Sequence, residues 1–394
     1  MKLTCLVLFG LFFVWPTGSA MALEGTRVLP DRLIKADTFL LTVPLSGSLA
    51  SWGQKAWQGA ELAFSNWGGG FKLKILDENG DSRILDEIDF RKVAASIGYF
   101  TENRFSIDAP RYIYFKTPVL LPYLSTKEAA GLGPGIFFRL LSTSQEQGRF
   151  LALEILKKSK RPTSLLIITG SGSAQIAQTA ALIETLVNPP PLLMSPLEEG
   201  ASSRAQSKAA PPLKPLDPKV QVLTLNIDQA LDSERLPEFG RRSPELIILA
   251  LDLDEALRLV PTLAEAPYRK AVFWGSFPLG FRDVGAAFIA FNLKLELALP
   301  GANLVNSKNQ AVLDFNRQYL ETYQAHPTWI AALAFDSLNL AIKAVSSGET
   351  DVAVLDFLAR RNHQALTAYD LSSNGASPPQ ALMSVSNETL GYLP

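Results

Sequence analysis

Side chains suited to catalysis are sparse in this chain of 394 residues, which has two histidines and a single cysteine. His326 precedes a proline and His363 follows two arginines, and both positions indicate surface residues rather than general bases. Gly170-Ser171-Gly172 matches only half of the glycine fingerprint of dinucleotide-binding folds, because Gln175 stands at the third glycine position. Neither the Gly-x-Ser-x-Gly elbow nor the Gly-x-x-x-x-Gly-Lys-Ser/Thr loop occurs. We therefore expect that the chain is not an enzyme.

The composition and net charge of the chain exclude several classes of binding partner. Lys plus Arg (37) balances Asp plus Glu (38), so a net charge of −1 provides no field that would attract nucleic acid. Two histidines and one cysteine cannot supply a Cys/His zinc cluster, and carboxylate-only metal sites show no motif. We expect no metal, no cofactor and no nucleic-acid partner. With 47% apolar and 19% charged residues, the chain is long and apolar enough to bury a sizeable core.

One segment is suited to binding rather than catalysis. A strand is predicted to end near Val43, Ser46-Gly47 forms a turn, and a helix opens before Gly59. The free backbone N–H groups at the start of such a helix suit an anionic group. The start of this helix could therefore hold an anionic group at the end of the strand.

The N-terminus has the pattern of an export signal. Lys2 precedes an apolar run from Leu3 to Trp15. The small residues that follow end in the Ala-x-Ala pattern Ala20-Met21-Ala22. We interpret residues 1–22 as a signal peptide with cleavage near Leu23, so the mature chain is expected in the periplasm. The alternative is a membrane anchor, although the run is short of the roughly 20 residues that a bilayer span needs.

The elements that must position a site alternate along the chain. Short apolar runs predict strands at Thr38 to Val43, Phe71 to Leu76, Pro118 to Leu121, Ser164 to Thr169, Glu245 to Leu251 and Ala271 to Trp274. Helix-period stretches follow most of them, at Trp52 to Trp67, Ser144 to Lys158, Ala174 to Val187 and Asp254 to Leu263. This alternation predicts an α/β fold with parallel sheets, divided into two lobes.

Two later regions depart from this rhythm. Segment 188–219 is rich in proline, serine and alanine and is interpreted as a flexible insertion in the second lobe. The last third predicts helices at Asn309 to Gln324, Thr328 to Ser346 and Asp351 to Arg360. Two strand-like runs follow, Ala365 to Leu371 and Ala381 to Val385, with Asn374-Gly375 as a turn between them.

Five strings of residues resemble, in order, type 1 periplasmic binding proteins of the branched-chain amino acid (Leu/Ile/Val) family. Val43 to Gln54 followed by Gly59 to Ala63 is similar to the opening of that family almost position for position. The others are Asp77 to Asp81, Pro118 to Thr126, Phe138-Arg139 with Ser144, Gln147 and Gly148, and Ala331 with Phe335, Asp336 and Ser337. Phe335 and Ser337 stand where the family has Tyr and Ala.

The resemblance implies two Rossmann-like α/β lobes, joined by a three-segment hinge and closing on a ligand. The first lobe is expected to comprise residues 38–140 and 292–361, and the second residues 141–291 and 365–394. The crossings are expected near Leu140, near Phe291 and between Arg361 and Ala368, and the final strands then return to the second lobe.

The resemblance also implies binding residues in the first lobe, where relatives hold a ligand carboxylate with hydroxyls and backbone N–H groups. Tyr123, Ser125 and Thr126 lie in the loop that presents such groups, and Thr101 falls near a second hydroxyl position. For Ser125 the alternative is a plain turn. Trp52 falls where the family places an aromatic ring over the ligand, or else packs on its own helix.

The second lobe departs from the family pattern. Phe277 occupies the place of the carboxylate that receives the ligand ammonium in amino acid binders. Asp252 could receive an ammonium instead, or could cap the following helix. A standard α-amino acid is therefore not assured as ligand, and an amide, a small carboxylate or an aromatic acid fits as well.

The function implied is capture of a small organic ligand for an ABC permease in the inner membrane. The alternative is a divergent binding-protein fold that acts as a sensor or as an assembly factor with a protein partner, without transport. The long insertion and the altered second lobe favour that alternative.

Overall fold

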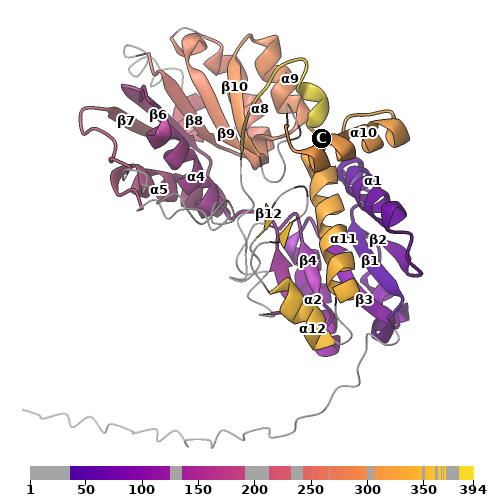
Figure 1. Ribbon diagram of the computed structural model, residues 1–394. Coiled ribbons are helices and arrows are strands. Elements are labelled where there is room, and N and C mark those ends of the chain that lie inside the picture. Colours follow the sequence, from indigo (N-terminus) through magenta and orange to yellow (C-terminus); the bar gives the residue numbers. More distant parts are fainter. Residues whose placement is uncertain are drawn as a thin grey trace, which may run out of the picture. The chain divides into compact units, whose positions relative to one another are not determined.

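The computed structural model describes residues 36–124, 135–190, 213–231, 243–265, 267–299, 304, 307–347, 351–359, 363–364, 366, 368–369 and 381–394. The predicted signal peptide (1–22), most of segment 188–219 and the Asn374-Gly375 turn lie outside these residues. Two mainly parallel sheets, flanked by helices, form the described part of the chain (Figure 1), which confirms the predicted fold class.

The first sheet has the strand order β2-β1-β3-β4-β5, all parallel. Its strands are β1 (Thr38–Val43), β2 (Lys72–Asp77), β3 (Val93–Gly98), β4 (Val119–Leu121) and β5 (Phe137–Arg139). The central strands β1 and β3 are almost wholly buried, whereas burial alternates along the edge strand β2. Apolar runs buried on both faces are typical of parallel strands covered by helices on each side.

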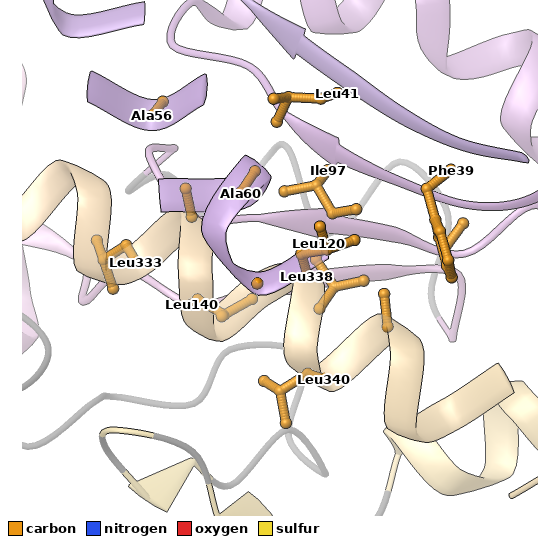
Figure 2. Close-up of a cluster of buried hydrophobic side chains, with 14 of the residues drawn as sticks. Phe39, Leu41, Ala56, Ala60, Ile97, Leu120, Leu140, Leu333, Leu338 and Leu340 are labelled. Atoms are coloured by element: carbon orange, nitrogen blue, oxygen red, sulfur yellow. The ribbon is translucent and has the colours of Figure 1, made fainter. Parts of the chain in front are cut away.

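The two faces of this sheet pack on different helices. Leu41 faces α1 (Ala50–Trp67) and α11 (Trp329–Ser347), while the neighbouring Leu40 faces α2 (Glu102–Phe115). Figure 2 shows the first of these clusters, with Leu41, Ile97 and Leu120 from the strands against side chains of the two helices. The helix α10 (Gln310–Tyr323) contacts α1. The helix α12 (Asp351–Leu358) contacts α11.

The second sheet has the order β13-β10-β9-β8-β6-β7. Its strands are β6 (Ser164–Thr169), β7 (Gln221–Asn226), β8 (Leu246–Ala250), β9 (Val272–Ser276), β10 (Lys294–Leu299) and β13 (Ala381–Ser384), of which β13 is antiparallel. Leu165 and Ile167 face α4 (Ser144–Lys157) and α5 (Ser173–Val187). Leu166 and Ile168 face the side of α8 (Leu253–Leu263) and α9 (Arg282–Ala290).

Shorter elements complete the described chain. They are α6 (Ile227–Leu231), the pair β11 (His363–Gln364) and β12 (Ala368–Tyr369), and the 3₁₀ helices η2 (Ser82–Glu87), η3 (Phe90–Lys92), η5 (Tyr268–Lys270), η6 (Phe277–Leu279) and η7 (Leu390–Tyr392). The two 3₁₀ helices η2 and η3 connect β2 to β3, so the chain returns to the sheet centre without a full α-helix there.

Every strand and helix predicted before residue 360 is present within a few residues of its expected bounds. The elements α2, β5, β7, α6, α9 and β10 were not predicted. The pairing of β10 with β9 corrects the crossing expected near Phe291, because the chain stays in the second sheet until Leu299. The remaining lobe limits stay a prediction.

The end of the predicted insertion is packed on the second sheet. Leu213 and Leu216 contact the cluster between this sheet and α4 and α5, and the N–H of Leu216 donates to the carbonyl of Leu186. The guanidinium of Arg161 donates to the carbonyl of Pro215 at 2.9 Å. Residues 213–216 therefore pack on the second lobe, which the prediction of a flexible insertion did not include.

Small residues allow the helices to approach closely. α11 is apolar and long enough to cross a membrane by composition, but 67% of it is buried, as in the core helix of a globular protein. It lies beside α1 (Figure 1), and a Cβ on Gly59 of α1 would come within 2.0 Å of the carbonyl oxygen of Ala331. The contact between these helices therefore requires glycine at position 59.

We expect Gly59→Ala to lower the free energy of unfolding by about 1 to 3 kcal/mol, as overpacking does in other cores. Gly70→Ala is the matched control, because a Cβ there meets no atom within 4 Å. Chemical denaturation of both variants measures the difference. Equal stability of the two variants would contradict the close packing of α1 on α11.

Candidate functional site

The predicted site residues follow the carboxyl ends of strands in both sheets. Trp52 follows β1, Thr101 follows β3, Tyr123 follows β4, Asp252 follows β8 and Phe277 follows β9. Ser125 and Thr126 lie outside the described residues. Ligands of open α/β sheets bind at this end of the strands, so each described residue is placed at the appropriate edge of its own sheet.

Thr101 is held by a carboxylate of the chain itself. Its N–H and its Oγ1 donate to Oε1 of Glu78, at 2.7 and 2.6 Å. The N–H of Phe100 donates to Oε2 of the same carboxylate at 2.8 Å. The donors that the sequence predicted for a ligand carboxylate at Thr101 are therefore engaged by Glu78.

Glu78 is only 3% exposed and belongs to a buried polar network. Burial raises the pKa of Glu78, while the hydrogen bonds from Thr101 and Phe100 and the charge of Arg104 act to lower it. The guanidinium of Arg104 donates to the carbonyls of Glu78 and Gly80 and pairs with Asp108 at 2.7 Å. This network fixes the turn after β2, Asp77 to Asp81, which we call the acidic turn, to the start of α2.

Tyr123 also has its polar group engaged within the core. Its hydroxyl donates to the carbonyl of Ile330 in α11 at 3.0 Å, and burial raises the pKa of this phenol well above its usual range. Its ring stacks on Phe100 at 4.0 Å between centroids. The predicted role of the Tyr123 hydroxyl in binding a ligand carboxylate is therefore replaced by a contact within the chain, to α11.

Four aromatic rings connect residues of the two sheets. Trp52 stacks on Phe281, with ring centroids 4.0 Å apart and an angle of 4° between the planes. Trp329 lies 6.4 Å from Phe281 and 6.0 Å from Phe277, and its indole N–H donates to the carbonyl of Gly280. We call Trp52, Phe277, Phe281 and Trp329 the ring cluster.

In the second sheet, Asp252 caps α8, which was one of the two alternatives predicted for it. Its side chain accepts from the N–H of Glu255 at 2.9 Å, and Glu255 accepts from the N–H of Asp252 at 3.0 Å. The carboxylate of Glu255, 8% exposed, also accepts from the N–H of Ser171 at 3.1 Å. An ammonium-binding role for Asp252 stays a prediction.

Sequence reasoning missed four of these participants. Glu78 was noted only within the family-like string Asp77 to Asp81, without a role in the site. Phe281 and Trp329 carried no signal, because their partners are distant in the chain. Glu255 could have been found, since its spacing after Asp252 is that of a capping box. Among the described residues, no group of three or more His, Cys, Asp or Glu side chains could hold a metal ion.

The face-to-face contact of Trp52 and Phe281 predicts an energetic coupling between them. In a double-mutant cycle with Trp52→Leu and Phe281→Leu, we expect a coupling of about 0.5 to 1.5 kcal/mol in the free energy of unfolding. As a control, Trp52→Leu combined with Phe288→Leu should be additive, because Phe288 packs on Phe273 instead. Additive losses for Trp52 and Phe281 would show that the stack contributes nothing beyond burial.

No protein-family model and no curated protein matches the chain. Solved structures do match it over most of its length. A leucine binding protein, LivK, from Thermotoga maritima is 15% identical with a TM-score of 0.60, covering 89% of this chain and 99% of that one. An ABC transporter solute binding protein from R. palustris in complex with benzoate is 16% identical, with a TM-score of 0.61 and coverage of 91% and 95%.

A further solute binding protein of an ABC transporter, from Rhodopseudomonas palustris HaA2 in complex with p-hydroxybenzoic acid, is 13% identical. Its TM-score is 0.64, with 89% of this chain and 93% of that chain covered. The similarity extends over both sheets in each case. The chain therefore has the two-lobe fold of the periplasmic solute-binding proteins of ABC transporters, as its sequence resemblance predicted.

Proposed function

We propose that this chain is an exported solute-binding protein that captures a small organic molecule and delivers it to an ABC-type permease in the inner membrane. Its fold supports the proposal, because its relatives in structure are solute-binding proteins. The observation that carries it is the gathering of aromatic side chains at the carboxyl ends of strands in both sheets, the edge at which such sheets bind ligands.

The proposed solute has an apolar body, as in an apolar amino acid, an amide or a small aromatic carboxylate. Aromatic side chains provide large apolar contact area with defined geometry. Phe277 lies in the ring cluster and offers no charge to an ammonium group. Two of the similar structures hold benzoate and p-hydroxybenzoic acid, which have apolar bodies and no ammonium.

Capture would operate through a shift between conformations. A solute that contacts residues of both lobes favours the conformation in which all those contacts form together. Hinge closure of this kind uses a few residues at the connections between lobes. The permease would then recognise the liganded conformation.

Binding without catalysis fits the two histidines. The ring of His326 packs on Tyr392, with centroids 4.7 Å apart, beside Gly391. His363 lies in the short strand β11, away from the site residues in sequence. The proposal assigns neither of them a proton-transfer role.

The second candidate is a sensor or assembly factor that contacts a protein partner and transports nothing. One observation favours it: Glu78 and Glu255 engage N–H donors that a solute could otherwise use. A protein that binds a protein partner instead of a solute does not need these N–H donors free, so it could pair them with its own carboxylates. The two candidates differ in whether any small solute binds.

A thermal-shift screen of apolar amino acids, amides, benzoate and hydroxybenzoates tests the proposal. A solute at 100 times its Kd should stabilise the protein by about 2.7 kcal/mol and raise the melting temperature. Trp52→Ala should weaken the response through lost contact area. Tyr114→Ala, at a ring that is 74% exposed on α2, should respond like the wild type.

The outcome separates the two candidates. A saturable response that Trp52→Ala reduces supports solute binding. No response to any member of the panel would contradict it and would favour the protein-partner candidate.

If the chain is exported, its signal peptide should be removed. Expressed in a bacterium with a periplasm, the full chain should yield a periplasmic form that begins near Leu23, because residues 1–22 carry the signal pattern. Intact-mass spectrometry of the periplasmic fraction measures this. A soluble cytoplasmic protein that keeps Met1 and its neighbours would refute export.

A further inference from the structure

We infer that Glu78 determines specificity in the first lobe: its carboxylate fills, from within the chain, a set of donors that would otherwise hold the carboxylate of a solute. The inference rests on the proposed solute-binding function for its biological meaning. It implies that the solute is recognised without an anionic contact at Thr101.

The geometry around Glu78 is that of a carboxylate-binding site. Two backbone N–H groups and one hydroxyl donate to it, at 2.8, 2.7 and 2.6 Å. Hydrogen bonds to an ionised acceptor are short and about twice as strong as neutral ones. Phe100 and Thr101 therefore form a site for one carboxylate, and Glu78 occupies it.

The donors are held by the backbone rather than by Glu78 alone. Gly98 adopts a φ of +134°, and a Cβ there would lie 1.9 Å from the carbonyl oxygen of Thr42. Tyr99 follows with a φ of 70°, a conformation that is uncommon for a residue with a side chain. Its fully buried ring donates its hydroxyl to Asp108 at 3.2 Å and lies 2.8 Å from the hydroxyl of Tyr112.

These contacts do not involve the Glu78 carboxylate. The loop after β3 is thus fixed on one side by Gly98 against β1 and on the other by Tyr99 in the core. Arg104, paired with Asp108, holds the backbone of the acidic turn through its carbonyls. Removing only the carboxylate of Glu78 should leave the donors in place and unpaired.

Two backbone N–H groups and one hydroxyl would then lack their acceptor in a part-buried place, so a small anion should bind to them. In Glu78→Ala we expect formate to raise the melting temperature saturably, by about 2 °C or more at a concentration ten times its Kd, against chloride at equal ionic strength. If the vacated volume is that of one carboxylate, acetate should raise the melting temperature less than formate does, because acetate carries an additional methyl group. Wild type should show no difference between formate and chloride.

Glu78→Gln is the matched control, because the amide fills the same volume and leaves no room for formate. A formate response in Glu78→Ala that is absent from Glu78→Gln and from the wild type supports the inference. An equal response in all three proteins, or in none, overturns it. If Glu78→Ala is recovered only unfolded, refolding in formate against chloride replaces the melt: recovery in formate alone supports the inference, and no recovery overturns it.

This experiment uses no solute from the screen. A wild type that binds no solute would contradict the proposed function without affecting the formate result. Conversely, a solute found by the screen together with no formate response would leave solute binding in place and remove Glu78 as the determinant.

Discussion

The acidic turn after β2 is the constraint on which the first lobe's strand-end loops depend. Asp77 accepts from the N–H of Leu45 at 2.8 Å and from the hydroxyl of Ser46 at 2.6 Å. Glu78, the next residue, accepts from Phe100 and Thr101. Two successive carboxylates at the end of an edge strand thus fix the loop after β1 and the loop after β3. A buried carboxylate without such donors would cost several kcal/mol, so the turn and the loops stabilise one another.

Aromatic side chains gather near the same strand ends, where they pack on one another. Trp52 follows the loop that Asp77 holds, and Phe100 lies in the loop that Glu78 holds. The hydroxyl of Tyr123 is engaged by the backbone of α11, and its ring stacks on Phe100. The polar groups in these loops, which could otherwise orient a solute, form hydrogen bonds within the chain that hold the loops and their aromatic rings in place. Specificity would then depend on the shape and apolar surface of the solute more than on its charge.

Local patterns account for the part of the fold that sequence could predict. The apolar runs of β1 and β6 and the helix period of α1 and α11 are signals within single elements, and these were found. β7 was missed because it is an exposed edge strand with one buried residue, so it lacks the apolar run of a central strand. β10 was missed because its charged residues Lys294 and Glu296 alternate with apolar ones, which is the signal of a half-buried strand rather than of the buried strands sought.

The site was harder to predict, because its chemistry depends on pairs distant in sequence. Thr101 was predicted as a ligand-binding hydroxyl after its strand, but its partner Glu78 lies 23 positions earlier in the chain. No spacing rule connects a turn after one strand to a loop after the next. The same holds for Trp52 and Phe281. Capping pairs such as Asp252 and Glu255 are the exception, since both partners lie within one helical turn.

The two buried carboxylates show how a shared fold can carry different chemistry. Glu78 engages N–H groups after β3 in the first sheet, and Glu255 engages the N–H of Ser171 after β6 in the second. Each lies where parallel strands direct free backbone donors to one edge, which is the property that makes this edge a binding site in other proteins. A carboxylate supplied by the chain satisfies those donors permanently, whereas one supplied by a solute satisfies them only on binding. An exchange of one for the other alters the ligand without altering the strands, so fold similarity at 13 to 16% identity is compatible with a different solute.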